Sequence, residues 1–183
     1  MNFGAMRSPF GWETNRDNMD AAELVSRYNQ GERDFREVHL SGLNLWKVNL
    51  SEADLSGADL VGVDFSEANL TGVNLSGANL TGTNLQHANL TDAKMILATL
   101  RGANLERVEL IKANLAQADL SWANLSQANL SGANLIGANF TDAKMEGLIL
   151  RGANLKQAKL KSQLQEYRID LAWAIMPDGL IHG

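Results

Sequence analysis

Ala68-Asn69-Leu70-Thr71-Gly72 and Ala133-Asn134-Leu135-Ile136-Gly137 are two copies of a five-residue pattern that runs without insertion or deletion from residue 38 to residue 160. Every fifth residue from Leu40 to Leu160 is large and apolar. Of these 25 residues 21 are leucine, and the others are Phe65, Met95, Phe140 and Met145. Alanine stands two residues earlier in 17 of the 25 repeats, and Asn or Asp stands one residue earlier in 18. A repeat this regular decides the fold before any other signal.

A strict period of five fits neither a strand, which repeats every 2 residues, nor a helix, which repeats every 3.6. The chain must return a leucine to the interior once per repeat, so each repeat needs a turn. Short extended pieces joined by corners and stacked on one another form a solenoid around a continuous core. The alanine fits the inside of a narrow corner, and alternation points the Asn or Asp outward. The last two positions, often Ser or Thr followed by Gly, have turn chemistry.

The repeated A-(N/D)-L-x-x pattern resembles that of the pentapeptide-repeat proteins, over about two-thirds of the chain. The resemblance implies an all-β fold: a right-handed quadrilateral parallel β-helix with four repeats per coil and the leucine and alanine inside. Twenty-five repeats then make about six coils, and a strand spacing near 4.8 Å gives a rod roughly 30 Å long.

The sequence divides into an N-terminal segment with a capping helix (1–34), the β-helix (35–160), and a C-terminal cap and tail (161–183). A helix is expected over residues 20–30, because Ala21, Leu24, Val25 and Tyr28 have helical spacing and Gly31 follows them. It would cover the open end of the first coil. Phe35 is already in register, which allows the array to begin one repeat before Leu40.

The five-residue register fails after residue 160, where Gln165 and Asp170 occupy the leucine positions. Helix-like spacing appears instead, in Leu160, Leu164, Tyr167, Leu171 and Ile175. A partly helical C-terminal cap is therefore predicted, followed by a turn at residues 177–179. The tail also resembles the tails of cyanobacterial members of the family.

The composition argues against several classes of protein. The chain has no cysteine, no apolar run long enough to span a membrane and no basic-then-apolar leader, so a cytoplasmic protein is expected. Its three histidines, His39, His87 and His182, lack partners at metal-ligand spacing, and no nucleotide-binding or nucleophile motif occurs. The Asn/Asp ladder is mostly neutral Asn, which favours stacking along the rod over a calcium site. We expect no enzyme, no cofactor and no metal.

The charge of the chain further limits its possible functions. Known pentapeptide-repeat proteins include DNA mimics that bind DNA gyrase or topoisomerase, which requires a dense acidic surface. Residues 35–160 hold 12 acidic and 10 basic residues, and the whole chain has a net charge of only −5, so neither DNA mimicry nor nucleic-acid binding is favoured. The charge is polarised along the rod instead. Residues 48–93 carry six acids and no Lys or Arg, and residues 143–161 carry five bases and one acid. This polarity would suit a protein partner or an antiparallel homodimer, although ordinary surface charge also explains it.

Two tryptophans fall in outward positions of the repeat, Trp46 and Trp122. Trp46 lies in an early coil, where packing under the N-terminal segment is the better interpretation. Trp122 lies in the middle of the array, with Gly102 and Asp142 one coil away on a four-sided model, and is the better candidate for binding a protein.

The segment from Thr91 to Met95 recurs as Thr141 to Met145, and both copies place lysine where the Asn normally stands, at Lys94 and Lys144. The offset of 50 residues is ten repeats, or two and a half coils, so the two copies should lie on opposite faces. A duplicated block explains them most simply, and an interaction site is the alternative.

These observations predict a non-enzymatic, regulatory scaffold that presents a rigid surface to another protein, with Trp122, Trp46, Asp142, Lys94 and Lys144 as candidate surface residues. Three alternatives stay open: the gyrase-binding DNA mimic, a regulator of cell differentiation by resemblance to cyanobacterial members, and an enzyme or ligand-binding protein that uses the terminal segments.

Overall fold

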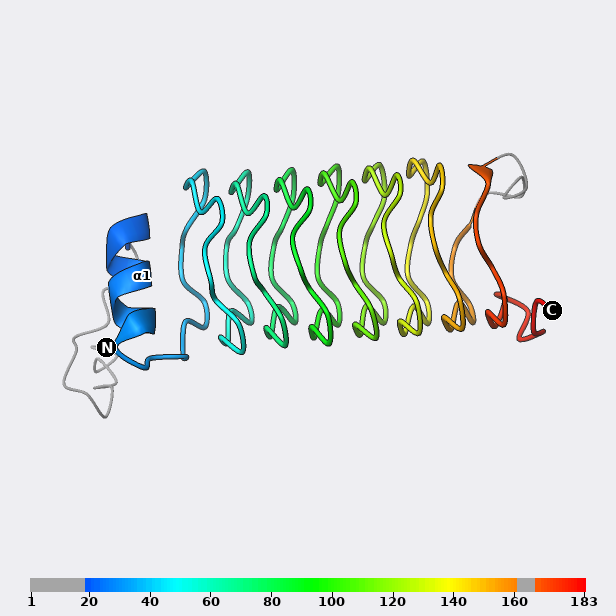
Figure 1. Cartoon of the computed structure of the whole chain (residues 1–183), viewed down its shortest axis with the longest axis horizontal. Helices are drawn as coiled ribbons and strands as arrows, with labels where there is room; N and C mark the ends of the chain where they lie inside the picture. The colour runs from blue at the N-terminus through cyan, green and yellow to red at the C-terminus, as the bar shows by residue number, and fades with distance from the viewer. Residues whose placement is uncertain (1–18, 161–166) are drawn as a thin grey trace, which may run out of the picture.

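The computed structural model describes residues 19–160 and 167–183, which form a rod of stacked coils with one α-helix at its N-terminal end (Figure 1). This helix, α1, spans Ala21–Asn29. Each repeat contributes one β-bridge residue, whose parallel partner lies 20 residues away, as Asp34 pairs with Asp54 and Asn114 with Asn134. Twenty residues are four repeats of five, so each coil has four sides, as predicted. The bridges begin at Asp34, one repeat before Leu40.

The five positions of a repeat have distinct structural roles, and we number them 1 to 5, so that Ala68 to Gly72 occupy positions 1 to 5. Position 2 forms the β-bridge on a flat face. Positions 4 and 5 form the turn at the corner between two faces. Equivalent positions stack along the rod every 20 residues, which creates four faces and four corners.

Every backbone N–H of a typical repeat has an acceptor. Asn69 donates to a carbonyl of the preceding coil (2.9 Å), whereas Leu70 (2.8 Å) and Gly72 (2.9 Å) donate to carbonyls of the next coil. The N–H of Ala68 closes the turn within its own coil (3.0 Å). The remaining N–H, that of Thr71, donates to the side-chain Oδ1 of Asn69 at 3.2 Å. Asn or Asp at position 2 therefore satisfies the one donor that the backbone leaves without an acceptor.

The core is a continuous column of position 1 and position 3 side chains. The large residues that replace leucine, Phe65, Met95, Phe140 and Met145, are as buried as the leucines around them. Thr83 is the polar exception at position 1, and its hydroxyl donates to a backbone carbonyl of the preceding coil at 2.9 Å. Each interior position is thus filled by an apolar group or by a satisfied polar one.

Position 2 side chains also bond to one another along the rod. Asn74 Nδ2 donates to Asp54 Oδ1 and Asn84 Nδ2 to Asp64 Oδ1, both at 3.0 Å. Asp64 accepts further bonds from the hydroxyl (2.6 Å) and the N–H (2.9 Å) of Ser66. The Ser66 hydroxyl, its N–H and the Asn84 amide stabilise the carboxylate and hold the pKa of Asp64 below its usual value despite partial burial. The stacking predicted for the Asn/Asp ladder is present.

The N-terminal end of the rod is covered by α1. Asp20 caps the helix by accepting from the N–H of Glu23 at 2.8 Å. Leu24 and Tyr28 are buried from the helix side, and the Tyr28 hydroxyl donates to the carbonyl of Ser51 at 3.0 Å. The sequence segment expected to be helical is therefore the segment that covers the first coil.

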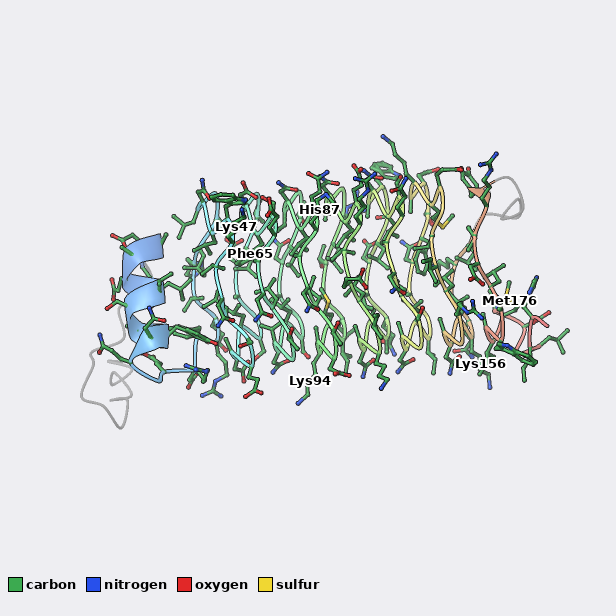
Figure 2. The ribbon with its side chains drawn as sticks, viewed as in Figure 1. Lys47, Phe65, His87, Lys94, Lys156 and Met176 are labelled. Atoms are coloured by element: carbon green, nitrogen blue, oxygen red, sulfur yellow. The ribbon has the colours of Figure 1, made fainter. Side chains whose placement is uncertain are left out.

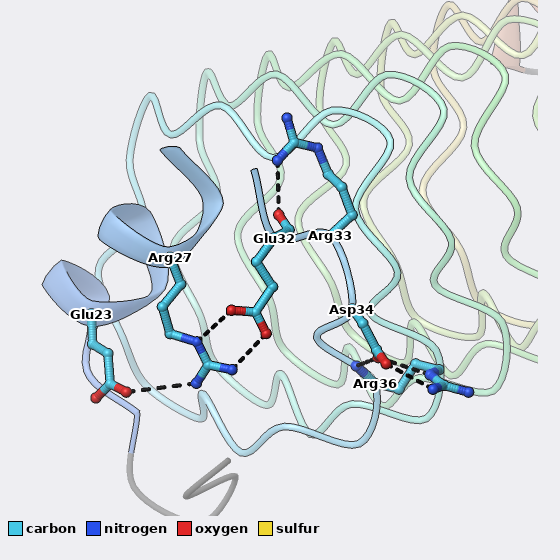
Figure 3. Close-up of polar contacts among 6 residues, drawn as sticks. All are labelled: Glu23, Arg27, Glu32, Arg33, Asp34 and Arg36. Carbon is cyan, nitrogen blue, oxygen red and sulfur yellow. Dashed lines mark hydrogen bonds and ion pairs between the residues drawn. The ribbon is translucent and has the colours of Figure 1, made fainter. Parts of the chain in front are cut away.

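A buried ion pair joins α1 to the segment that follows it (Figure 3). Arg27 donates from Nε to Glu32 Oε2 (2.7 Å) and from Nη2 to Glu32 Oε1 (2.6 Å), and both side chains are buried. The hydrogen bond to Glu32 raises the pKa of Arg27. Loss of either partner would leave a buried charge without its counterion. The pair links α1 to the chain that enters the first coil.

The structure describes residues 167–183 of the predicted C-terminal cap, and a partly helical cap stays a prediction because residues 161–166 lie outside the described residues. Residues 167–183 contain no α-helix; instead Asp170 bridges Ile149 and Ile175 bridges Asn154, both in parallel. These partners are 21 residues apart rather than 20. The coil therefore continues with one extra residue before Asp170, and Ala174 and Met176 take positions 1 and 3. The shift of phase made a continuing period of five resemble a helical period; Leu164 and Gln165 lie outside the described residues.

The tail folds back on the last coil. Gly179 has a left-handed φ of 87°, and Ile181 pairs antiparallel with Ile175. The N–H of Trp173 donates to the carbonyl of His182 at 2.8 Å, in the role that the next coil has elsewhere. The tail thus covers part of the edge that an open β-helix would leave unpaired.

Candidate protein-interaction surface

The corners carry most of the variation in this protein. Position 5 has a left-handed backbone in every repeat from Glu37 to Gln157, with φ of 62° at both Gly102 and Trp122. Glycine adopts this conformation without steric strain, whereas a bulky side chain is an outlier there. Three large apolar residues nevertheless occupy it, Leu97, Trp122 and Trp173, and all three are exposed. The interior explains none of these side chains, so they are the first candidates for contacts outside the chain.

Trp122 is held in a defined orientation although 57% of it is exposed. Its indole Nε1 donates to Asp142 Oδ2 at 2.9 Å, one coil further along. On the other side, the guanidinium carbon of Arg101 lies 5.3 Å from the centre of the indole rings, within cation–π range. Arg101 is itself 3.8 Å from Asp119 Oδ2. These contacts reduce the entropy that the indole would lose on binding a partner.

A flat surface adjoins Trp122 on the N-terminal side. Trp122 and this surface belong to one row of corner residues, which backbone hydrogen bonds link from coil to coil, and we call the row the Trp122 corner. It contains Gly42, Val61, Gly62, Thr81, Gly82, Arg101, Gly102, Ser121, Trp122, Thr141 and Asp142. A Cβ built on any of its four glycines would meet no atom within 4 Å. A partner can therefore approach the backbone closely beside the indole.

Trp46 lies on a different corner, which we call the Lys47 corner and which also contains Glu67 and His87. It is 52% exposed beside the described residues, and its packing under the N-terminal segment stays a prediction because residues 1–18 lie outside the described residues. Its indole donates to Glu67 Oε1 at 3.4 Å, and Lys47 Nζ lies 4.2 Å from its ring. The hydrogen bond from Lys47, followed by that from Trp46, lowers the pKa of Glu67. A groove between Trp46 and α1 is lined by Ala21 and Val25.

Of the predicted surface residues, the structure brings together Trp122 and Asp142. Lys94 lies in the ladder between Asn74 and Asn114, and Lys144 pairs with Asn124 on the opposite face. The two repeated blocks therefore lie on opposite faces, as the offset of ten repeats predicts, and they do not form one site.

Sequence reasoning missed Leu97 and its neighbour Ile96. Leu97 has a φ of 59° and is 60% exposed, and Ile96 is also exposed. The signal was in the sequence, because Leu97 is an aliphatic residue at the position where Gly77 and Gly137 stand on the same corner. We call this row the Leu97 corner; it contains Arg36, Glu37, Ser56, Gly57, Ser76, Gly77, Ile96, Leu97, Ala116, Gln117, Ile136, Gly137, Lys156 and Gln157.

The described residues offer few side chains arranged for metal binding or catalysis. Residues 19–160 and 167–183 contain no cluster of three or more His, Asp or Glu side chains that could hold a metal ion. His39 and Asp59 line a groove beside α1, but Nδ1 and Oδ2 are 3.9 Å apart and both side chains are largely exposed. General acid–base catalysis favours a desolvated pocket with shorter hydrogen bonds. Within the same residues, no helix is long and apolar enough to cross a membrane.

The geometry defines a four-sided β-helical repeat protein with side chains displayed at its corners. The model of the pentapeptide-repeat family matches in eight copies, within residues 34–157, and the chain belongs to that family. The solved members form right-handed quadrilateral β-helices, in agreement with the predicted fold class.

Several solved structures are similar. HetL from the cyanobacterium Nostoc sp. strain PCC 7120, involved in heterocyst differentiation regulation, is 28% identical over 90% of this chain and 100% of its own, with a TM-score of 0.44. QnrB1, a plasmid-mediated fluoroquinolone resistance protein, is 16% identical over 76% of this chain and 70% of its own, with a TM-score of 0.71. A protein of the Arabidopsis thaliana thylakoid lumen is 27% identical over 67% of this chain and 75% of its own, with a TM-score of 0.38. The curated proteins yield no significant match.

Proposed function

We propose that this protein is a non-enzymatic, regulatory scaffold that binds another protein through the Trp122 corner. The observation that carries the proposal is Trp122 itself, which is exposed, has a left-handed backbone and is oriented by Asp142 and Arg101. An aromatic anchor that is already ordered is typical of binding hot spots. Its backbone strain and its exposure are both unfavourable in the isolated chain, and a partner that buries the indole offsets them.

The flat glycine row beside Trp122 suggests the kind of contact. A partner segment that lies along Gly62, Gly82 and Gly102 can approach the backbone while its own apolar groups pack on the indole and on Val61, which is also exposed. Asp142 and Arg101 supply opposite charges at the same place, so the binding surface is an aromatic centre with a polar rim.

The alternatives receive less support from the same surfaces. A DNA mimic needs a continuous acidic surface. Each of the four corners that carry acids also carries Lys or Arg, and so does every flat face that carries acids except the face of Glu109 and Asp170, as Arg101 beside Asp119 illustrates. QnrB1 shares the fold at 16% identity. A regulator of cell differentiation, as HetL is described, would be one form of the proposed scaffold. A cytoplasmic location remains part of the proposal.

The test is a pull-down from a lysate of the source organism, with nuclease present and at moderate salt, comparing the native protein with Trp122→Gly. Glycine suits the left-handed backbone at this position, so the fold should be retained. The matched control is Trp173→Gly, since Trp173 is also exposed and has a φ of 61°. We expect a specific protein to be retained by the native chain and by Trp173→Gly and lost with Trp122→Gly. Retention by all three would exclude the Trp122 corner, and the absence of any specific protein would contradict the scaffold function.

A further inference from the structure

The Leu97 corner has an apolar centre that the fold does not require. Leu97 combines a left-handed backbone with 60% exposure, and Ile96 beside it is 37% exposed. The N–H of Gly77 donates to the carbonyl of Ile96 (2.9 Å) and that of Leu97 to the carbonyl of Ala116 (3.0 Å), so this centre is continuous with the rest of the corner. Both the strain and the exposure are unfavourable in an isolated rod.

The two halves of this corner differ in shape. Toward the N-terminus it presents Ser56, Gly57, Ser76 and Gly77, which are small. Toward the C-terminus it presents Ala116 and Ile136, which extend the apolar surface from Ile96. One half therefore projects apolar groups. The other half is open at Gly77, where an added Cβ would meet no atom within 4 Å, whereas the Glu37 side chain lies over Gly57, with its Cγ 3.4 Å from the place of an added Cβ.

The two ends of the corner differ in charge. At the N-terminal end lie Asp34, Glu37 and Asp54, together with Arg36, whose charge is matched by a two-point hydrogen bond to Asp34 (2.7 and 2.8 Å). At the C-terminal end lies Lys156, and Pro177 and Asp178 continue the corner beyond it, because the N–H of Gln157 donates to the carbonyl of Pro177 at 3.0 Å. Figure 2 shows Lys94 and Lys156 along one edge of the rod and Lys47 and His87 along the opposite edge. Backbone hydrogen bonds from coil to coil place Glu37 in the first rung of the Leu97 corner and Lys156 in the seventh, so these two charges lie toward opposite ends of the rod.

These features are self-complementary about one point. From residue 36 to residue 157 the corner has seven rungs at 20-residue intervals, and Ile96–Leu97 is the fourth of these seven. A two-fold axis through this rung and perpendicular to the rod would pair Leu97 with Leu97 of a second copy. It would also place Ile136 against Ser56 and Gly57, and Lys156 against Glu37, each contact being made twice.

We propose that two copies of this protein associate side by side and antiparallel through the Leu97 corner. The apolar rungs of each copy pack on the small rungs of the other, and Lys156 pairs with Glu37 of the second copy at both ends of the interface. The Trp122 corner is one face away, and an axis of this direction leaves both Trp122 corners on the same side of the dimer. The dimer thus presents two binding sites to a partner, which adds avidity.

The test is sedimentation equilibrium of the full chain over a wide concentration range at low salt. The native protein should be a concentration-dependent dimer that weakens as salt is raised, because the terminal charge pairs are screened. Leu97→Gly places the favoured residue at a left-handed position, so it should keep the fold and weaken dimerisation about 10- to 100-fold. The matched control, Trp122→Gly, should leave the dimer unchanged.

A charge exchange tests the register. Glu37 and Lys156 are six rungs apart within one chain, about 29 Å at 4.8 Å per coil, so they cannot pair intramolecularly. Glu37→Lys and Lys156→Glu should each weaken the dimer about tenfold at low salt, and the double variant should restore it. A monomer at all concentrations, a dimer that is insensitive to Leu97→Gly, or a double variant weaker than either single one would overturn the proposal. A dimer lost with Trp173→Gly instead would indicate end-to-end association and would also overturn it.

Discussion

The interior and the corners of this rod are built by the same five-residue repeat and obey different rules. Position 3 is large and apolar in every repeat from Leu40 to Leu160, and every one of these side chains except Leu160 is buried. Position 5, two residues later, holds glycine, acids, bases, amides, leucine and tryptophan, all with a left-handed backbone. Packing selects the residue at position 3, whereas at position 5 only a modest backbone preference opposes variation. Function therefore has more freedom at the corners than anywhere else in the repeat.

The difference between the interior and the corners is tested most strongly by replacing a leucine with alanine at one position of each kind. Leu105→Ala at position 3 should lower the free energy of unfolding by about 2–5 kcal/mol, because it opens a cavity in a fully buried column. Leu97→Ala, the same change at an exposed corner, should alter it by less than about 0.5 kcal/mol. Urea unfolding followed by circular dichroism, at a concentration where both variants are monomeric, measures both. Equal losses would show that the corner is as tightly packed as the interior.

A substitution in the ladder at position 2 should lower the free energy of unfolding by an amount between those for the interior and for the corner. Asn104 accepts from the N–H of Glu106 (3.3 Å) and donates to Asn84 Oδ1 (3.1 Å), and these bonds extend from coil to coil. Asn104→Ala leaves a corner N–H without an acceptor, and we expect a loss of about 1–2 kcal/mol in the free energy of unfolding. Thr99→Ala is the control, because the side chain of Thr99 forms no hydrogen bond within the described residues. The same urea titration measures the free energy of unfolding of both variants. A loss with Thr99→Ala as large as that with Asn104→Ala would contradict the stabilising role assigned to the ladder.

The backbone preference at the corners can be measured with two opposite changes. Lys112 has a φ of 57°, and Lys112→Gly should stabilise the rod by about 0.5–1 kcal/mol through relief of that strain. Gly102 has a φ of 62° with open space around it, so Gly102→Ala should cost a similar amount for backbone reasons alone. Melting temperatures of the two variants should therefore move in opposite directions. A shift in the same direction would mean that corner side chains affect stability through their contacts.

The sequence predicts the interior well because its period is tied to burial. Leucine at every fifth residue is sufficient for a stacked coil, and Asn at position 2 is sufficient for a ladder. The C-terminal coil was missed because a one-residue shift before Asp170 breaks the register, although Ala174 and Met176 still follow the period of five. The sequence pattern alone does not show that a corner can accommodate one extra residue while the coil continues.

The corners are predictable only in part. Trp122 stood out as an aromatic residue in an outward position, and the spacing of 20 residues placed Asp142 next to it. Leu97 did not stand out, because a leucine in a leucine-rich chain attracts no notice until its backbone is known to be left-handed. Chemistry in an unusual position is visible in the sequence, whereas an ordinary residue in a strained conformation is visible only in the structure.

The smallest expected effect concerns the pH dependence of the ladder. Because the Ser66 hydroxyl and its N–H lower the pKa of Asp64 in the folded chain, the unfolded chain takes up the proton more readily. This contribution to stability is complete above the unfolded pKa, near 3.9, and is lost as the pH falls through the folded pKa. Asp64→Asn keeps an oxygen acceptor for Ser66 but does not titrate, so unfolding measured from pH 6 down to pH 2.5 should lose less stability in this variant than in the native protein. Ser66→Ala removes the first cause of the shift and should have an intermediate slope. An unchanged slope in both variants would mean that the ladder carboxylates do not contribute to the acid sensitivity of the rod, and that its neutral Asn positions and its Asp positions are equivalent for stability.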